Sequence, residues 1–467
     1  MVQVENLYCN HLCKLIFALF FGLIKIARGS YAMNTLCVVG LGYVGLPTAV
    51  VAAQHGYTVI GFDINHERVT LINKAVPPIH EPELQERLSE VLATRRFYAT
   101  NELPKADCYI IAVPTPLGRY SSADLTYVFA ATDAIIKKLE PGNLVILEST
   151  VPVGTTDLLA KMILQKTGFV AGKDVFVAHC PERVWPSKVF HEIIYNDRVI
   201  GGVTALCAQK AADIYARFVQ GALVQKSAIF AELVKLVENS SIDVSVALAH
   251  QVATLAEEVN IDPYELIEVA NKHPRVKIWT PTCGVGGHCV AVDPWFLIQT
   301  YPQKTRLLQA ARLVNDERPQ QVIVSFHAAI KQWQEQSGQQ RCSVAVLGLT
   351  YKANVDDMRE SPALKIAQTL ATDKTIACFV SDPYVSQEKL NVLFGSQAAP
   401  FEVAVSQADI VIVLVAHTHF KHLTVSADKI LLDFSGLQLH HGLKNSVKNS
   451  ACFVRTHNSV WHKNASM

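Results

Sequence analysis

The stretch Cys37-Val38-Val39-Gly40-Leu41-Gly42-Tyr43-Val44-Gly45 decides the fold of this chain. A short apolar strand leads into the glycine pattern G-x-G-x-x-G, and residues 46–54 predict a helix directly after it. A second apolar strand is predicted at 58–62 and ends at Asp63, about 20 residues beyond the glycines. Strand, glycine turn, helix, strand and acid in this order predict a dinucleotide-binding βαβ unit.

Each glycine of this pattern meets a different geometric demand. Gly40 permits the tight turn, Gly42 lets the backbone approach a pyrophosphate, and Gly45 lets the helix pack against the strand. The helix N-terminus then offers free N–H groups to the phosphates. Asp63 would accept hydrogen bonds from the adenosine ribose, which favours NAD over NADP. The expected cofactor is therefore NAD.

The alternation of strands and helices continues downstream and returns near the C-terminus. Strands are predicted at 106–113 and 144–147, and a second set at 344–349, 376–380, 408–416 and 431–436. The strand at 376–380 leads to Asp382, as the strand at 58–62 leads to Asp63. Buried strands alternating with helices form parallel α/β sheets. Two related domains are predicted, and the second turn (Gly348-Leu349-Thr350-Tyr351) lacks the later glycines, so we expect it to hold another ligand.

A helical region is predicted between the two sets, because strand signals disappear from residue 205 to 315. Residues 229–259 contain neither Pro nor Gly and carry apolar residues at helical spacing. Such a helix would join the end domains or pack in a dimer, and two shorter helices with a kink near Ser240-Ser241 remain the alternative. The predicted fold class is α/β, with two Rossmann-like doubly wound parallel-sheet domains joined by a helical region with a long central helix. The expected domains are an extension (1–32), an NAD-binding domain (33–204), a helical dimerisation domain (205–318) and a second Rossmann-like domain (319–467).

Composition excludes several classes of protein. Of 467 residues 50% are hydrophobic and 18% charged, which gives ample core and excludes a disordered chain. Lys plus Arg number 42 against 41 Asp plus Glu, so no basic surplus points to nucleic acid. The 11 cysteines are odd in number, irregularly spaced and too dilute for a disulfide scaffold. A reduced protein of the cytoplasm is expected.

The N-terminal extension fits this description least well. The apolar run at 15–24 is flanked by Lys14 and Lys25, and it is about half as long as a bilayer-spanning helix. An upstream start or unstructured leader is favoured, since Met33 directly precedes the first strand. A weak membrane-associating helix and a signal peptide remain open as less favoured alternatives.

A second dense motif is the cysteine-containing loop at 280–293. Three glycines in four positions, ending at Gly287, make a backbone that can come close to a ligand. Cys289 beside that loop, with Asp293 four residues on, has the character of a covalent nucleophile. A buried cysteine in a tight turn is the alternative. A zinc site from Cys283, His288 and Cys289 is disfavoured because no second ligand pair has suitable spacing, so no metal is expected.

Lys235 and Asn239 lie four residues apart on the predicted long helix and share a face. A partly buried lysine there could have its pKa lowered toward neutrality and act as a base. An ordinary solvated pair is the alternative.

Six motifs in order resemble the UDP-glucose/GDP-mannose dehydrogenase family over residues 33–458. They are Gly40–Pro47, Ala112–Pro116, Glu148-Ser149-Thr150, Cys180-Pro181-Glu182-Arg183, Gly286-Gly287-His288-Cys289, and Gly348–Lys352 with Asp357–Pro362. Within the family, residues 271–276 and 292–296 look most similar to members that oxidise UDP-N-acetyl-D-mannosamine. That resemblance implies a UDP-sugar substrate held by the second Rossmann-like domain, a homodimer, and a place in polysaccharide biosynthesis.

The resemblance also implies a four-electron oxidation of a sugar C6 alcohol to a carboxylate, using two NAD⁺ in succession. Lys235 with Asp293, through water, would take the hydroxyl proton. Cys289 would trap the aldehyde as a thiohemiacetal, while Lys235 and Asn239 stabilise the oxyanion. A water near Thr150 and Glu182 would hydrolyse the resulting thioester.

Carried over position by position, the resemblance implies two further sets of contacts. The cofactor contacts, besides the three glycines, are Tyr43, Val44, Asp63, Arg68, Thr115, Thr150 and Arg359. The UDP-sugar contacts are Arg183, Val184, Lys235, Asn239, His273, Arg275, Gly286, Tyr351 and Lys352. In the family the arginine matching Arg275 reaches across a dimer interface.

Two positions depart from the family pattern. Ile242 stands where close relatives carry an arginine, and Ser435 where they carry a lysine. Both are cations expected near the substrate, and a charged hydrogen bond contributes about 1.5–3 kcal/mol. These departures keep open a non-catalytic NAD- or nucleotide-sugar-binding protein as an alternative function. A one-step β-hydroxyacid dehydrogenase is the other alternative, since it also has an N-terminal Rossmann domain followed by a helical domain, but the second α/β domain and the Gly286-Gly287-His288-Cys289 loop disfavour it.

Overall fold

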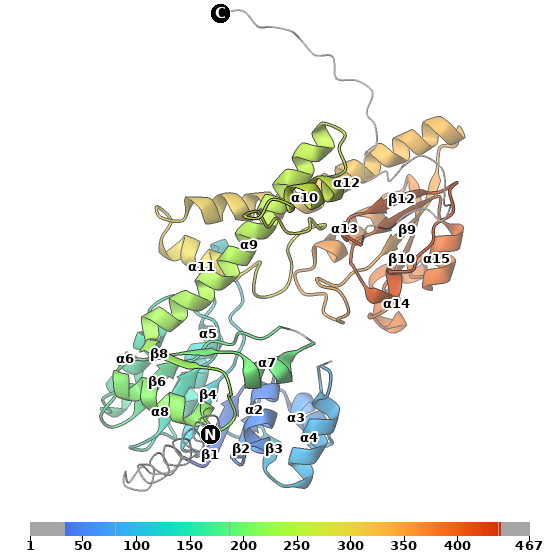
Figure 1. The fold of residues 1–467 in the computed structure, drawn as a ribbon. Helices are drawn as coiled ribbons and strands as arrows, with labels where there is room; N and C mark the ends of the chain where they lie inside the picture. Colours follow the sequence, from blue (N-terminus) through green and yellow to red (C-terminus); the bar gives the residue numbers. More distant parts are fainter. Residues whose placement is uncertain (1–32, 80, 186, 438, 440–467) are drawn as a thin grey trace, which may run out of the picture.

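The computed structural model describes residues 33–79, 81–185, 187–437 and 439 (Figure 1). The predictions for residues 1–32 and for the C-terminal end of the last domain lie outside this part of the chain. Within it, no helix is both long enough and apolar enough to cross a membrane.

The first domain is built on an eight-stranded sheet with strand order β3-β2-β1-β4-β5-β6-β7-β8. All neighbouring strands are parallel except the β6–β7 pair. The strands are β1 (Thr35–Val39), β2 (Thr58–Phe62), β3 (Phe97–Thr100), β4 (Cys108–Ile111), β5 (Leu144–Leu147), β6 (Phe176–His179), β7 (Arg198–Gly202) and β8 (Leu223–Ser227). Alternate side chains of the strands enter two separate cores, one on each face.

Helices cover both faces of this sheet, as the continuous apolar strands predict. One core contains residues of α2 (Gly45–Gln54), α4 (Leu84–Ala93), α7 (Val189–Tyr195) and α8 (Ala205–Tyr215). The opposite core contains residues of α5 (Thr126–Ile136) and α6 (Thr155–Thr167). The small helix α3 (His66–Asn73) packs beside β3, and a short 3₁₀ turn η1 covers Arg119–Ser121.

The first sheet extends beyond residue 204, where the sequence places the domain boundary. α8 packs on β7, and β8 pairs with β7 as the last strand. The expectation that strands are absent from 205 to 315 is therefore wrong. β8 reads Leu-Val-Gln-Lys-Ser and is mostly exposed, so this edge strand carries little of the apolar signal on which the prediction depends. We propose that the first domain ends after Ser227.

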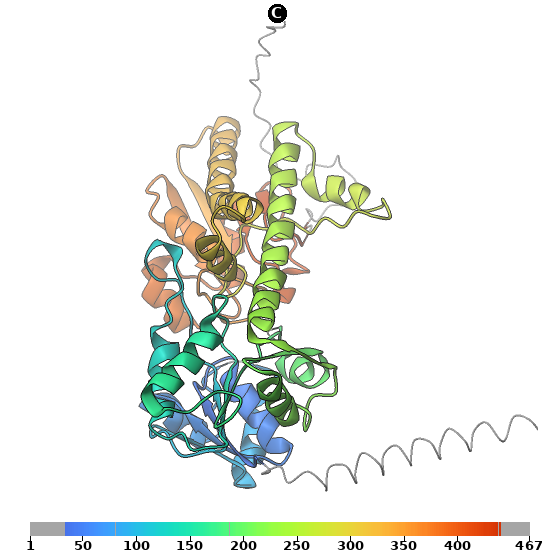
Figure 2. The ribbon, with the colours of Figure 1, turned by 90° about the vertical axis from the view of Figure 1, so that its left-hand side faces the viewer.

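The long central helix forms as one piece. α9 (Ala228–Glu258) contains 31 residues, about 45 Å, so the alternative of two helices kinked at Ser240-Ser241 is wrong. It begins at the edge of the first sheet, where the Ser227 side chain caps it, and runs alongside both domains (Figure 2). α10 (Pro263–Ala270) lies at its far end, and α11 (Asp293–Thr300) packs against it.

A second long helix, α12 (Arg306–Ser337), packs against α9. The buried Arg312 guanidinium donates to the Asp243 carboxylate at 2.6 Å, and Asn315 donates to the same oxygen at 2.8 Å. α12 continues through residues 318–319, where the sequence places the second boundary, with Pro319 inside it. Residues after Pro319 pack in the core of the second domain, so we keep this boundary as a proposal.

The second domain is built on a four-stranded parallel sheet with strand order β10-β9-β11-β12. Its elements are β9 (Cys342–Leu347), α13 (Pro362–Ala371), β10 (Ile376–Ser381), α14 (Gln387–Phe394), η2 (Gly395–Gln397), α15 (Phe401–Gln407), β11 (Ile410–Val413), η3 (Thr418–Phe420) and β12 (Ile430–Asp433). One face packs on α12, α13 and α14, and the other on α15. The predicted class, two Rossmann-like domains joined by a helical region, is confirmed.

Candidate active site

The glycine turn between β1 and α2 has the shape that a dinucleotide requires. Gly40 has φ +95°, and a Cβ on it would lie 2.5 Å from the Ala112 carbonyl oxygen. A Cβ on Gly45 would lie 1.9 Å from the Gly40 carbonyl oxygen, so neither position accepts a side chain. Nothing lies within 4 Å of a Cβ on Gly42, which leaves the approach open. Among the described residues no side chain caps α2, so its N-terminal N–H groups fit a pyrophosphate.

Asp63 lies beside this turn, directly after β2. Its Oδ2 accepts the Leu41 N–H and the Arg68 guanidinium, each at 2.9 Å, and its Oδ1 accepts the Asn65 N–H. The carboxylate is thus fixed at the edge of the glycine turn, where a ribose would lie. These residues fit NAD, which supplies a hydride acceptor when bound.

Five of the predicted catalytic residues lie together beside the N-terminal half of α9: Lys235, Asn239, Asp293, Cys289 and Glu182. The Lys235 ammonium lies 3.8 Å from the Glu182 carboxylate, which belongs to the loop after β6. Four residues along the same helix face, the Asn239 amide donates to the Asp293 carboxylate at 2.5 Å. The Asp293 N–H donates to the Cys289 carbonyl at 2.8 Å, so one turn of chain holds thiol and carboxylate together.

Lys235 is a buried cation whose charge is maintained by its neighbours. Burial acts to lower its pKa, but Glu182, Cys289 and Asp293 outweigh this and raise the pKa above its usual value. The expectation of a lysine tuned toward neutrality is therefore wrong, because that prediction counted burial and not the acids that face the ammonium. A cation in this place suits the stabilisation of an oxyanion.

Asp293 has the properties of the base. Burial raises its pKa to about 7, against the lowering effects of Lys235 and of the hydrogen bond from Asn239. A carboxyl group whose pKa lies near neutrality can both take and return a proton under working conditions. The carboxylate is thus the group of this site with the properties of a base, and the lysine faces it as an opposite charge.

Cys289 is accessible while its thiol remains protonated at neutral pH. It is the one exposed cysteine among the eight in the described ranges. Dense surrounding protein and the Asp293 carboxylate raise the pKa of the thiol, which Lys235 opposes. Cys283 differs: it is buried in the second domain's core, donates to the Leu414 carbonyl, and has a pKa raised to about 12 by burial.

The glycines of the cysteine loop pack against the protein itself. A Cβ on Gly286 would lie 2.6 Å from the Glu360 carbonyl oxygen, and one on Gly287 would lie 2.7 Å from the Tyr351 ring. The expectation that these glycines bring backbone close to a ligand is incomplete, since they first dock the loop on the second domain. Tyr351 and Gly286 are thereby held next to Cys289. Across the described segments, no group of three or more His, Cys, Asp or Glu side chains could hold a metal.

The second domain also reaches the cofactor side of the site. Arg359 forms a two-pronged ion pair with Asp357 and lies over the Tyr43 ring, 5.1 Å from its centroid. The Tyr43 hydroxyl donates to Asp356 at 3.4 Å. Arg359 and Tyr43, both predicted as cofactor contacts, are therefore brought together from the two domains.

Lys352 makes a further contact between the domains that the sequence did not indicate. Its ammonium lies 3.8 Å from the centroid of the Trp185 ring, in the loop that carries Glu182. Burial lowers the pKa of Lys352 to about 8. A lone tryptophan two residues beyond Arg183 gives no sequence signal for this pairing.

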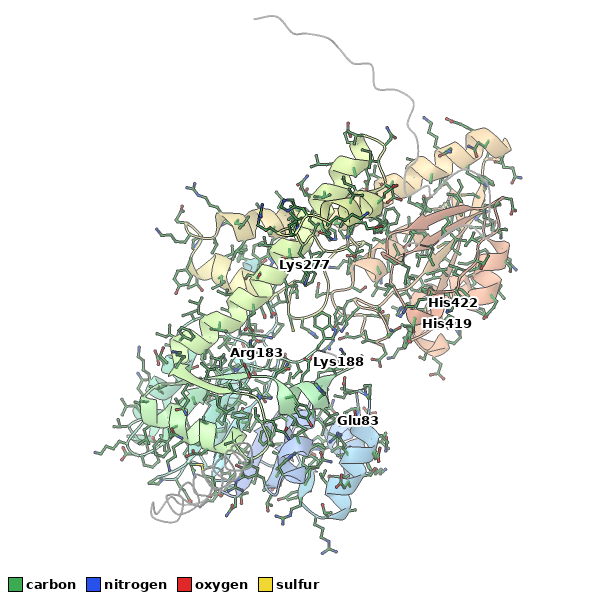
Figure 3. All side chains as sticks on the ribbon, viewed as in Figure 1. Glu83, Arg183, Lys188, Lys277, His419 and His422 are labelled. Carbon is green, nitrogen blue, oxygen red and sulfur yellow. The ribbon has the colours of Figure 1, made fainter. Side chains whose placement is uncertain are left out.

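Other predicted residues are placed differently. Arg183 (Figure 3) is held by an ion pair with Glu238 on α9, at 2.6 Å, and Val184 donates its N–H to Glu182. Thr115 and Thr150 are half-buried in loops that follow β4 and β5. His273 and Arg275 are exposed in the segment after α10, the helix that lies at the far end of α9 (Figure 1).

Glu232 is a buried anchor that sequence reasoning missed. It lies three residues before Lys235 and accepts the Gly154 N–H, the Thr156 N–H and the Thr156 hydroxyl, all within 2.7 Å. It therefore ties the second turn of α9 to the N-terminus of α6. An acid three residues before the predicted lysine on the same helix face was the available signal.

The two departures have distinct surroundings. Ser435 is buried and its hydroxyl donates to Asp433 at 2.6 Å, so it supports the end of β12. Ile242 lies on α9, half-buried, directly before Asp243. Neither supplies the cation that the family pattern has there.

Comparison with known proteins matches three domain models of the UDP-glucose/GDP-mannose dehydrogenase family. The NAD binding domain matches residues 34–219, the central domain 230–317 and the UDP binding domain 345–437. The UDP-N-acetyl-D-mannosamine dehydrogenase of Campylobacter jejuni is 42% identical over 85% of this chain and 98% of its own length. The NDP-N-acetyl-D-galactosaminuronic acid dehydrogenase of Ralstonia solanacearum is 40% identical over 86% of this chain and 96% of its own. The structure of UDP-D-ManNAc dehydrogenase from Pyrococcus horikoshii superposes with a TM-score of 0.80 at 37% identity, covering 90% of this chain and 98% of that one.

The cysteines should differ sharply in their reactivity toward iodoacetamide. Among the eight described thiols Cys289 is expected to be alkylated first, at a rate that increases with pH because its pKa is raised. Peptide mass spectrometry of a time course at pH 7 and pH 9 measures this, with the buried Cys283 as internal control. Equal labelling of Cys283 and Cys289 in the folded protein would contradict the placement of both thiols.

Proposed function

Because the chain belongs to the UDP-glucose/GDP-mannose dehydrogenase family, we propose that it oxidises the C6 alcohol of a UDP-N-acetylhexosamine to a carboxylate with NAD⁺. UDP-N-acetyl-D-mannosamine is the first candidate, since relatives at about 40% identity over most of their length carry that name. The observation that carries the proposal is the proximity of Cys289, Asp293 and the charged Lys235, next to the loop after β6 of the NAD-binding domain.

In the first oxidation, the alcohol must lose its hydroxyl proton as a hydride leaves C6. Asp293 takes that proton, directly or through water, because its pKa of about 7 lets it exist as a carboxylate at neutral pH. Lys235 faces the developing alkoxide with a positive charge, and Asn239 keeps Asp293 in place. The product of this step is the aldehyde.

In the second oxidation, the Cys289 sulfur adds to the aldehyde carbon and its thiol proton passes to the oxyanion, which gives a thiohemiacetal. Loss of a second hydride from that carbon, with loss of the hydroxyl proton, gives a thioester. Water then attacks the thioester, the C–S bond breaks, and the acid and the free thiol result. We assign the placement of that water to Glu182, half of the ion pair with Lys235, together with Thr150.

Two other functions make different demands on the site. A one-step β-hydroxyacid dehydrogenase needs neither the second α/β domain nor an accessible cysteine beside Asp293, and NADH formation from a small hydroxy acid but not from UDP-sugars would favour it. A non-catalytic nucleotide-sugar-binding protein has no use for a base held near neutral pKa. We therefore place both below the two-step dehydrogenase, which would act in the cytoplasm on a precursor of polysaccharide.

Replacing the nucleophile should separate the two oxidations. Wild-type protein should release two NADH per UDP-sugar, whereas Cys289→Ser should release no more than one and form no acid, because the aldehyde can no longer become a thioester. NADH absorbance with product analysis by mass spectrometry measures both quantities. Cys283→Ala, a change at the buried thiol of the same loop, is the matched control and should keep the ratio of two.

The substrate itself is tested in the same assay with UDP-N-acetyl-D-mannosamine, UDP-N-acetyl-D-glucosamine, UDP-glucose and GDP-mannose. Acid formation from the first of these, faster than from the other three, is the expected result. Two NADH per sugar from Cys289→Ser would exclude the covalent route, and tight UDP-sugar binding without NADH from any of the four would point to the non-catalytic protein.

The pH dependence should report the base. Since burial raises the pKa of Asp293 to about 7, its reactive carboxylate form is populated only as the pH rises through 7. The ratio kcat/KM should therefore increase through pH 7 in the wild type and level off above it. Asp293→Asn should lower kcat/KM by about 10²–10⁴-fold and remove this limb. A wild-type profile that is flat between pH 6 and 8 would assign the proton transfer elsewhere.

We infer a homodimer from the outer face of α9. Apolar side chains that are 40–61% exposed lie on this face in two groups, near the two ends of the helix. They are Phe230, Leu233 and Val237 in the first group and Leu248, Leu255 and Val259 in the second, and together we call them the apolar stripe. A stripe of this length needs a partner of the same kind to be covered. The exposed Arg275 would then reach the site of the second protomer.

The dimer is tested by Leu248→Asp, which places a charge in the middle of the stripe. Sedimentation velocity should show a dimer for wild type and a monomer for the variant, while Val392→Asp, on the exposed surface of α14, should stay dimeric. Mixing inactive Arg275→Ala with inactive Lys235→Ala should restore part of the activity, because mixed dimers hold one intact site. Absence of recovery from confirmed mixed dimers would place Arg275 in its own protomer's site or outside both.

A further inference from the structure

Asp382 in the second domain occupies the position that Asp63 has in the first. Each acid follows the second strand of its sheet, and each accepts the N–H of the residue after the first glycine. The Leu41 N–H donates to Asp63 at 2.9 Å, and the Leu349 N–H donates to Asp382 at 2.6 Å. The two turns thus make the same hydrogen bond to an acid, although the second turn lacks the later glycines of the G-x-G-x-x-G pattern.

In each acid Oδ1 accepts a backbone N–H, from Asn65 or Tyr384, and the two acids differ in which side chain faces the Oδ2 that also accepts the turn N–H. Asp63 is met by Arg68, whose side chain is 37% exposed and can move aside for a ligand. Asp382 is met at 3.1 Å by the Nε2 of His417, which is fully buried between the rings of Tyr384 and Phe420. The place of a dinucleotide ribose is therefore filled in the second domain by a side chain of the protein.

The second ring nitrogen of His417 holds a different segment. Nδ1 accepts the Asn354 N–H at 3.0 Å, which requires an unprotonated Nδ1 and places the hydrogen on Nε2, where it faces Asp382. Asn354 has φ +60°, a conformation that non-glycine residues adopt at a cost and that surrounding bonds must hold. Its Oδ1 accepts the N–H and the hydroxyl of Thr418, the residue after His417.

The other end of this segment is fixed at the same place. The Thr350 hydroxyl lies 3.3 Å from His417 Nε2 and donates to the Lys352 carbonyl at 2.8 Å. Residues 350–354 are therefore tied at both ends to one buried imidazole. Between the ties lie Tyr351, which packs on the cysteine loop, and Lys352, which reaches the first domain.

We propose that His417 is the positioning residue for the nucleotide-binding loop 350–354, and that it converts the second domain from a dinucleotide turn into a UDP turn. Its Nε2 faces the Asp382 carboxylate, so that this acid is not available to a ribose. Its Nδ1 accepts the Asn354 N–H and so fixes the conformation of the segment that presents Tyr351 and Lys352 to the diphosphate. The identity of the ligand rests on the proposed function. His417 touches no reacting atom and acts through the loop.

Two conservative substitutions separate its two bonds. His417→Asn keeps an acceptor near the Nδ1 position and so retains the tie to Asn354, whereas His417→Gln keeps a donor near Nε2 and loses that tie. UDP affinity, measured by calorimetry with UDP as the probe, should fall about tenfold in His417→Gln and less in His417→Asn. KM for the UDP-sugar should rise in parallel, with kcat and KM for NAD⁺ unchanged.

Matched controls come from the same turn, where His419 and His422 (Figure 3) are exposed. His419→Gln and His422→Gln should leave UDP affinity and Tm at wild-type values. A His417→Gln variant that binds UDP like wild type, or that loses NAD⁺ and UDP affinity together with a large fall in Tm, would overturn the positioning role. Wild-type protein that binds no UDP would instead overturn the proposed function, so the two failures are distinguishable.

Discussion

The buried charge of Lys235 is the constraint on which the rest of the site depends. An ammonium at 6% exposure costs several kcal/mol unless opposite charges compensate it. Its partners come from two separate segments: Glu182 from the loop after β6 and Asp293 from the beginning of α11. The lysine can stay charged only while the NAD-binding domain, α9 and the cysteine loop are assembled. The same arrangement places the Asp293 carboxyl, whose pKa is about 7, and the accessible Cys289 thiol beside the Lys235 ammonium.

α9 connects the elements around the site through polar side chains on its buried face, which it shares with alanines and Leu236. These polar residues recur at helical spacing, and each contacts a different element. Glu232 binds the N-terminus of α6, Lys235 pairs with the loop after β6, and Asn239 binds α11. Further along, Asp243 binds α12 and His250 accepts the N–H of Thr282 in the cysteine loop. Its exposed face is the apolar stripe. A surface helix of a monomer normally has the opposite distribution. Internal hydrogen bonds thus position the candidate catalytic residues, and the exposed apolar side chains are the surface from which we propose the dimer.

Most strands and most residue types of the site could be predicted from local sequence patterns, and the features that could not be predicted have physical causes. β2 and β5 have their predicted bounds because buried parallel strands are continuous apolar runs. β8 was missed because an exposed edge strand lacks that run. The charge of Lys235 and the docking of Gly287 on Tyr351 depend on residues distant in sequence, which no local pattern records. The sequence therefore predicted which residues form the candidate site, whereas their protonation states and contact partners could be identified only from the folded structure.

The two α/β domains carry this argument one step further. Strand, glycine turn, strand and acid recur in both, and the missing later glycines of the second turn indicate a different ligand without showing what replaces the dinucleotide ribose. The difference lies in one side chain that approaches from outside the unit, His417 after β11. Asp63 and Asp382 are alike in burial and in their bond to the turn, yet one remains reachable past a half-exposed arginine and the other is covered. An acid at the end of the second strand therefore indicates a ribose site only when no buried donor already faces it.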